Sequence, residues 1–238
     1  MITLALDTSS PVGSLAVLRD ETIIGEISTN TLEAYSSRIF RHLEFLLREL
    51  QLKLHEFDLF AVAAGPGSFT GLRVGLTAAK AWAEAYGKPI AAVSALEAIA
   101  AQSISTTEIL VPVIDARRGE VYFAMYHKPE SAAGQDLALE GEECSLPPEE
   151  FLNTLLNREG SQTVAIVSPT PEALASVASR FENNSVRLER VSGVLAPVIG
   201  RIGFRLAKLG KVYDSLSLDA NYVRRSDAEV RWKESSGS

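Results

Sequence analysis

A pattern of apolar strand, aspartate, polar turn and second strand occurs twice in the sequence and limits the folds open to this chain. In the first copy, an apolar run ends at Asp7, and a turn rich in hydroxyl residues precedes a second run at 14–18. In the second copy, the run 109–114 ends at Asp115, and a short turn leads into the alternating residues 120–127. Identity between the copies is negligible, so the pattern alone predicts a structural duplication in which each copy opens with a β-hairpin.

The segments between and after the two hairpins alternate in period between strand and helix. An apolar run at 58–64 suits a sheet covered on both faces, and 32–50 has the period of an amphipathic helix. The remaining expected elements are a strand at 22–28, a helix at 71–86, a strand at 90–93, helices at 95–102 and 148–157, a strand at 163–167, and helices at 172–181 and 196–209.

This order predicts an α/β fold of two lobes with mixed sheets. We expect an N-terminal lobe at 1–107, a C-terminal lobe at 108–232 and a polar tail at 233–238. Residues 128–150 are expected to be mostly loop, and the last helix, 196–209, can pack back on the first lobe.

Composition excludes several classes of protein. The 238 residues are 46% hydrophobic and 22% charged, which is enough apolar material for a sizeable core. The net charge of −7 disfavours a stand-alone nucleic-acid binder, and the basic cluster at 224–233 is expected to be a solvated tail. A single cysteine, Cys144, the absence of a basic stretch before Asp7 and the lack of a long apolar run favour a cytoplasmic protein without membrane segments.

Asp7 stands where a strand ends and a hydroxyl-rich turn begins, and two interpretations are open. Its carboxylate could orient a metal-bound water while Thr8, Ser9 and the turn amides face a phosphate. Alternatively, Asp7 bonds its own backbone in an Asx turn that closes the hairpin.

The glycine-rich loop 65–71 follows a buried-type strand and opens a helix, which is where backbone amides can meet an anion. The candidate anion-binding residues in it are Gly65, Gly67 and Ser68. The loop is neither a Walker A sequence nor a dinucleotide fingerprint. The alternative is a tight strand-to-helix turn with Ser68 or Thr70 as the helix N-cap.

Helices 32–50 and 71–86 each have more apolar surface than one buried stripe requires, and the second is rich in small residues. Together they predict a surface for a protein partner, and the alternative is ordinary burial against the chain's own sheet. The candidate interface residues are Ile39, Leu43, Leu46, Leu72, Gly75, Ala79 and Trp82. The histidines are far apart and Cys144 has no catalytic neighbour, so neither a metal site nor a catalytic triad is predicted.

Four stretches of this sequence resemble the TsaB (YeaZ) family. They are Leu4-Ala-Leu-Asp-Thr-Ser-Ser10, Gly13-Ser-Leu-Ala-Val17, Ala64-Gly-Pro-Gly-Ser-Phe-Thr-Gly-Leu-Arg-Val-Gly75 and Ile114-Asp-Ala-Arg-Arg-Gly-Glu-Val-Tyr122. The resemblance is densest over 1–126 and implies the duplicated, two-lobed fold of actin, sugar kinases and chaperone ATPases, which is ribonuclease H-like.

The resemblance also implies a function: a non-catalytic partner subunit of the complex that transfers threonylcarbamoyl to N6 of the adenosine next to the anticodon of tRNA. Such a subunit binds a TsaD-like catalytic subunit, helps to recruit a TsaE-like ATPase, and forms homodimers through the same helical surface. tRNA is then reached indirectly through the complex, which agrees with the charge of −7.

The sequence departs from the family pattern at Tyr35, where many members have a histidine. It also lacks the His-x-x-x-His metal motif of the catalytic partner, and its second turn, 116–119, is not glycine-rich. No cofactor is therefore expected to bind autonomously, while ATP or ADP with Mg at the partner interface stays open. The alternative function is a small-molecule kinase or nucleotide hydrolase that uses Asp7 and the 65–71 loop. A peptidase ranks last, because neither a metal site nor an activated nucleophile is recognisable.

Overall fold

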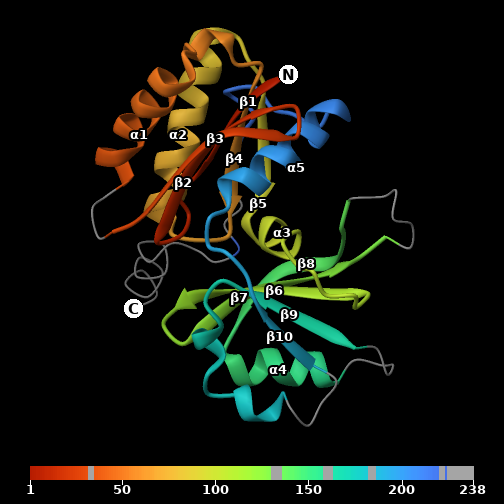
Figure 1. Cartoon of the computed structure of the whole chain (residues 1–238). Helices are drawn as coiled ribbons and strands as arrows, with labels where there is room; N and C mark the ends of the chain where they lie inside the picture. The colour runs from red at the N-terminus through yellow and green to blue at the C-terminus, as the bar shows by residue number, and fades with distance from the viewer. Residues whose placement is uncertain (32–34, 130–135, 158–162, 182–185, 220–222, 224–238) are drawn as a thin grey trace, which may run out of the picture.

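The computed structural model shows two lobes, each built around a five-stranded mixed sheet (Figure 1). The residues described are 1–31, 35–129, 136–157, 163–181, 186–219 and 223. The basic cluster at 224–233 and the tail at 233–238 lie outside them. In the described part of the chain, no helix is both long enough and apolar enough to cross a membrane.

The sheet of the first lobe has the strand order β3-β2-β1-β4-β5. Its strands are β1 (Ile2–Asp7), β2 (Val12–Arg19), β3 (Thr22–Asn30), β4 (Leu59–Gly65) and β5 (Ile90–Ser94). The first three strands form an antiparallel meander, and β4 and β5 then add in parallel beside β1.

The sheet of the second lobe repeats this topology, with the order β10-β9-β6-β7-β8. Its strands are β6 (Ile109–Arg117), β7 (Glu120–His127), β8 (Ala138–Leu146), β9 (Val164–Ser168) and β10 (Val186–Arg190). Strands β6, β7 and β8 are again an antiparallel meander, and β9 and β10 again add in parallel. The predicted duplication within a mixed α/β fold is therefore confirmed.

Helices cover the first sheet on both faces. The helices described in the two lobes together are α1 (Tyr35–Leu50), α2 (Phe69–Tyr86), α3 (Ala95–Ala100), α4 (Pro148–Leu156) and α5 (Ala196–Lys208), and α4 packs on the second sheet. Helices α1 and α2 lie together on the outer face of this sheet, whereas α5, the last helix among the described residues, packs on its inner face (Figure 1). Helix α3 contacts strands of both sheets. The boundary between the two lobes that the sequence places near residue 107 therefore stays a prediction.

The local sequence explains the central β4–α2 unit of the first lobe. Every residue of β4 is buried, as its unbroken apolar run predicts for a strand covered on both faces. Ser68 caps α2 by accepting a hydrogen bond from the Gly71 amide, and Gly87 ends the helix in the left-handed region at φ 61°. A fully buried side chain such as Phe60 contributes about 1.5–3 kcal/mol to the stability of this core.

The second lobe departs from the sequence prediction in three places. Strand β8 lies within the segment 128–150 that was expected to be mostly loop, and β10 was not expected at all. Both are edge strands whose exposed, charged residues do not show the apolar alternation of a half-buried strand. The helix expected at 172–181 is instead two short 3₁₀ turns, Pro171–Leu174 and Ala178–Arg180.

Candidate functional site: the cleft between the lobes

The corresponding turns of the two copies line one cavity of about 860 Å³ between the lobes. The first lobe contributes Ser9 and Ser10 from the β1–β2 turn, together with the glycine loop and the start of α2. The second lobe contributes Asp115 and the β6–β7 turn. Of the six residues predicted to bind an anion, Ser9, Gly67 and Ser68 line this cavity, whereas Asp7, Thr8 and Gly65 do not.

Asp7 is completely buried at the end of β1. Its Oδ1 atom accepts hydrogen bonds from the Ser9 amide at 2.7 Å and the Ser9 hydroxyl at 2.6 Å, and Ser10 Oγ donates to Oδ2 at 3.4 Å. Burial raises the pKa of Asp7 from 3.8 to about 6, although the bonds from Ser9 and Ser10 oppose the shift. The carboxylate therefore closes an Asx turn behind the cavity wall.

Asp115 makes the same turn in the second copy. Its Oδ1 atom accepts a hydrogen bond from the Arg117 amide at 2.7 Å, as Asp7 does from Ser9. Unlike Asp7, its side chain is 37% exposed, and its other oxygen lies 3.5 Å from Arg117 Nη1. The duplication thus extends to the turn, but only the second copy presents its carboxylate to the cleft.

Arg117 and Arg118 also line the cleft, and the sequence analysis did not select them. Their backbone lies in the left-handed region, at φ 63° and 57°, which is unusual for residues other than glycine. They occupy the second lobe's counterpart of the hydroxyl-rich turn. Guanidinium groups can bind phosphate or carboxylate oxygens, so this wall of the cleft is suited to an anion.

The β1–β2 turn and the glycine loop form one structural unit. The Ser68 amide donates to the Ser9 carbonyl at 2.7 Å, and the Thr8 hydroxyl donates to the Gly71 carbonyl at 2.7 Å. A Cβ atom would lie 2.6 Å from the Ser9 carbonyl oxygen at Gly67 and 1.9 Å from the Thr8 carbonyl oxygen at Gly71. Close packing of α2 on the first hairpin therefore accounts for these glycines.

Tyr35 packs against the same turn and also lines the cavity. Its hydroxyl donates to the Ser10 carbonyl, and its ring lies so close to Gly13 that a Cβ there would be 2.0 Å from Cε1. Burial raises the pKa of Tyr35, and the charge of Asp7 adds to the shift. In this chain a tyrosine at the start of α1 therefore shields the turn.

The seven residues predicted to contact a partner are all buried in the chain's own core. They are Ile39, Leu43, Leu46, Leu72, Gly75, Ala79 and Trp82. The apolar side chains that α1 and α2 do expose are Phe40, at 58%, Phe45, at 43%, and Tyr86, at 38%. The Phe40 ring stands edge-on to Trp82, with centroids 6.5 Å apart, so Phe40 lies directly over one of the predicted residues.

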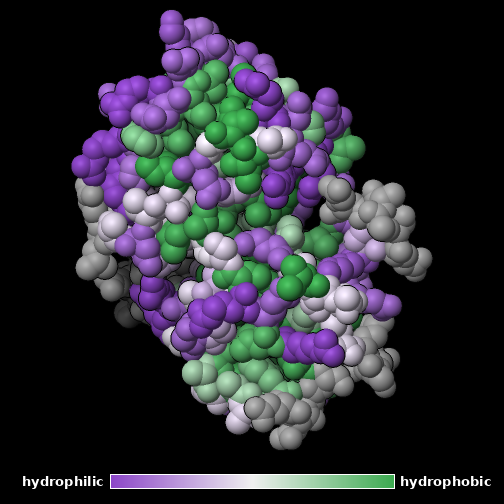
Figure 2. Space-filling model, viewed as in Figure 1, coloured by the Kyte–Doolittle hydropathy of each residue, from purple (hydrophilic) through white to green (hydrophobic). Residues whose placement is uncertain are grey.

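We call this outward side of α1 and α2, with Phe40, Phe45 and Tyr86, the aromatic face. In Figure 2 apolar patches interrupt the polar surface of the first lobe, to which α1 and α2 belong. The sequence signal for the aromatic face was Phe40, which is apolar but lies off the buried stripe of α1.

Among the described residues, no group of three or more histidine, cysteine, aspartate or glutamate side chains could hold a metal ion. The cleft therefore offers hydroxyls, backbone amides, one exposed carboxylate and two arginines. Such a set can bind an anionic or polar ligand by hydrogen bonds and charge.

The duplicated sheets and the cleft between them define the class of protein: a two-lobed α/β protein whose lobes repeat one mixed-sheet topology. Two solved structures share the fold. The structure of YeaZ from Pseudomonas aeruginosa matches with a TM-score of 0.76 and 24% identity over 93% of this chain and 99% of that one. A second, from the same organism and described as similar to the peptidase YEAZ, matches with the same TM-score over 94% of this chain.

The family model described as "TsaD: tRNA N6-adenosine threonylcarbamoyltransferase" matches residues 22–177. The tRNA threonylcarbamoyladenosine biosynthesis protein TsaB of Bacillus subtilis is 39% identical over 126 residues, which are 53% of this chain and 55% of that protein. The protein of the same name from Escherichia coli is 33% identical over 131 residues, 54% of this chain and 56% of that protein.

This chain thus spans about half the length of the curated relatives it matches. It belongs to the tRNA N6-adenosine threonylcarbamoyltransferase family that this model describes, and it is similar to the proteins named TsaB and YeaZ.

Proposed function

We propose that this chain is a non-catalytic partner subunit of the complex that transfers threonylcarbamoyl to N6 of the adenosine next to the anticodon of tRNA. The observation that supports this proposal most is the aromatic face, where α1 leaves Phe40 and Phe45 exposed, five residues apart, and α2 leaves Tyr86 exposed. Exposed aromatic side chains over a packed helix pair are typical of protein interfaces.

The aromatic face is the surface we assign to a TsaD-like catalytic subunit. The two helices leave one such surface, so a homodimer would use it in the absence of that subunit and would compete with it. A TsaE-like ATPase would then join the assembled pair. The net charge of −7 favours a role in which partners make most of the contact with tRNA, and we place this activity in the cytoplasm.

The burial of Asp7 supports a non-catalytic role. A kinase or nucleotide hydrolase that used Asp7 would need its carboxylate at the substrate, but this carboxylate is fully buried and bonded to the Ser9 turn. The cleft still has Ser9, Ser68 and Arg117 on its walls, so ATP or ADP with Mg could bind there once a partner completes the site.

The experiment is size-exclusion chromatography with light scattering of this chain, alone and mixed with a TsaD-type and a TsaE-type subunit from the same source. We expect a homodimer that a TsaD-type subunit converts into a heterodimer, and the Phe40→Asp, Phe45→Asp double variant should lose both pairings. Ile104→Asp is the matched control, because Ile104 is 89% exposed and lies away from α1 and α2. A chain that stays monomeric and binds neither subunit would sink the proposal.

Gly75→Arg is the substitution that the sequence favours for disrupting the helix surface, but the structure makes it unsuitable. A Cβ atom at Gly75 would lie 2.5 Å from Thr8 Oγ1, inside the core. That variant would report on folding and leave the interface untested.

Isothermal titration of the isolated chain with ATP and magnesium separates the proposal from the kinase or hydrolase alternative. We expect no tight binding by the chain alone. Tight binding that Asp7→Ala abolishes while the chain remains folded would favour the enzyme.

A further inference from the structure

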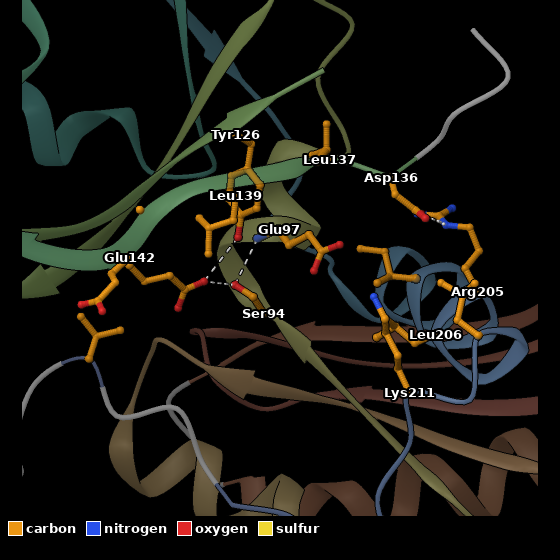
Figure 3. A pocket seen from close by; sticks show the side chains of 15 residues that line it. Ser94, Glu97, Tyr126, Asp136, Leu137, Leu139, Glu142, Arg205, Leu206 and Lys211 are labelled. Carbon is orange, nitrogen blue, oxygen red and sulfur yellow. Dashed lines mark hydrogen bonds and ion pairs between the residues drawn. The ribbon is translucent and has the colours of Figure 1, made fainter. Parts of the chain in front are cut away.

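Arg38, near the start of α1, carries a charged side chain that is only 3% exposed. Charged groups around a second cavity between the lobes, of about 710 Å³, are bonded to one another: Arg205 Nε donates to Asp136 at 3.1 Å (Figure 3). Arg38 instead donates from Nη1 to the Thr29 hydroxyl, at 2.5 Å. A neutral hydroxyl does not balance the charge of a buried guanidinium group.

The other edge of the Arg38 guanidinium is unsatisfied. Within the part of the chain that the structure describes, neither Nε nor Nη2 has a hydrogen-bond partner, and both atoms are shielded from solvent. On β3, Thr29 lies between Ser28 and Asn30, and opposite Gly13 of β2, so the sheet supplies no carboxylate at this point. Buried polar groups nearly always have a partner, and a buried charge is costly without an opposite charge. This edge of Arg38 is therefore a donor pair suited to an anion.

The guanidinium group of Arg38 points back toward the beginning of α1. Its Cζ atom lies 4.7 Å from the centre of the Tyr35 ring, and Tyr35 is the first residue of the helix. The first amides of a helix have no acceptor within the helix, and the helix dipole places partial positive charge there. The first turn of α1 contains no acidic residue. A buried cation and a helix N-terminus thus add their positive potentials at the same place.

Asp7 acts on the same tyrosine but does not provide the counter-charge. Burial and then the charge of Asp7 raise the pKa of Tyr35, whereas Arg38 lowers it. The Asp7 oxygens accept hydrogen bonds from the hydroxyls of Ser9 and Ser10. The Tyr35 ring lines the interlobe cavity and Arg38 does not, so the ring separates the guanidinium group from the cleft.

We propose that the start of α1 binds one tetrahedral oxyanion, a phosphate group, through Nε and Nη2 of Arg38 and the first amides of the helix. The Nε–Nη2 edge presents two parallel N–H donors, which match two oxygens of a phosphate or a carboxylate. A phosphate group has further oxygens for the helix amides, whereas Arg38 would occupy both oxygens of a carboxylate. The group is either inorganic phosphate or the phosphate of a small monoester.

The experiment is isothermal titration of the full chain at constant ionic strength with inorganic phosphate, methyl phosphate and acetate. We expect inorganic phosphate to bind at least roughly tenfold more tightly than acetate, because acetate leaves the helix amides without an acceptor. Methyl phosphate that binds as tightly as inorganic phosphate would assign the site to a monoester. Methyl phosphate that binds at least roughly tenfold more weakly would assign it to the free ion.

Arg38→Met should weaken binding of inorganic phosphate by roughly tenfold or more, because it removes both donors and the charge. Arg38→Lys keeps the charge but has no paired donors, so it should weaken binding to a smaller extent. Arg48→Met is the matched control: Arg48 lies on the same helix, its side chain is 69% exposed, and its Nε lies 3.7 Å from Glu49. Circular dichroism establishes that each variant is folded.

Three results would overturn the proposal. The first is that inorganic phosphate does not bind at millimolar concentration, or binds no more tightly than acetate. The second is that Arg48→Met weakens binding as much as Arg38→Met. The third is that Arg117→Met abolishes binding while Arg38→Met retains it, which would place the phosphate in the cleft.

Discussion

Gly71→Ala should destabilise the protein, although glycine-to-alanine substitution inside a helix ordinarily stabilises by about 0.5–1 kcal/mol. Gly71 lies in the first turns of α2, and a Cβ atom there would come 1.9 Å from the Thr8 carbonyl oxygen. The obstructing atom belongs to the backbone of the β1–β2 turn, so it cannot rotate away as a side chain would. Either α2 or the turn must move.

The magnitude follows from what that movement breaks. Overpacking of this kind costs about 1–3 kcal/mol, and separation of the hydrogen bond from Thr8 Oγ1 to the Gly71 carbonyl costs about 1 kcal/mol more. After subtraction of the helix gain of about 1 kcal/mol, the net loss is about 1–3 kcal/mol. For a chain of this length that lowers Tm by roughly 2–12 °C.

Thermal unfolding followed by circular dichroism measures the loss, with Thr77→Ala as the matched control. Thr77 is exposed on the same helix, so its replacement should leave Tm unchanged or raise it slightly. A Gly71→Ala variant as stable as the wild type would refute the claim that the two motifs pack against each other.

Three further predictions follow from buried groups. Burial raises the pKa of Asp7 from 3.8 to about 6. Between these two pH values the folded state holds a proton that the unfolded state has already released, so the free energy of unfolding falls as the pH rises through 6. When the pH is raised from 5 to 8, the free energy of unfolding of Asp7→Asn, measured in urea, should therefore increase by about 1.5 kcal/mol relative to that of the wild type. A difference between the two proteins that does not change with pH would contradict the burial argument. Gly203→Ala should lose about 1–3 kcal/mol, since its Cβ would lie 2.6 Å from Ala61 Cβ; equal or higher stability in the same assay would contradict the close packing of α5. Ser168→Ala should lose about 1–3 kcal/mol in chemical denaturation, because the buried Ser168 hydroxyl donates to the Val113 carbonyl and accepts from the Thr170 amide, and an unchanged midpoint would argue against that network.

The first lobe was largely predictable from the sequence because its signals are local. The apolar β4, the capping Ser68 and the stop at Gly87 each carry a physical requirement that a short window of sequence contains. The edge strands β8 and β10 were not predictable, because pairing with a neighbour fixes them and their exposed residues follow no apolar period.

The candidate sites were predictable only in part, for a related reason. The sequence identified Asp7 and the glycine loop as unusual, but whether the carboxylate faces a cavity or the interior depends on how the Ser9 turn folds over it. The sequence pattern predicted that apolar residues on α1 and α2 contact a partner. In the structure these residues are buried in the core, and Phe40 is exposed to solvent. Periodicity identifies the buried face of a helix more readily than an interface.

The cavity lined by Ser94, Glu97, Tyr126 and Arg205 left no signal in the sequence. These residues come from four elements spread over both lobes, and the packing of the lobes and of α5 brings them together. A site assembled in this way requires the fold before it can be recognised.

The central claim, that this chain acts as a non-catalytic partner through its aromatic face, is tested most directly by measuring threonylcarbamoyl transfer to tRNA. The assay contains a TsaD-type catalytic subunit, a TsaE-type ATPase and threonylcarbamoyl-adenylate, with and without this chain. We expect no transfer by this chain alone, transfer when the wild type joins the other components, and none when the Phe40→Asp, Phe45→Asp variant replaces it. Transfer by the chain alone, or full activity with that variant, would contradict the account.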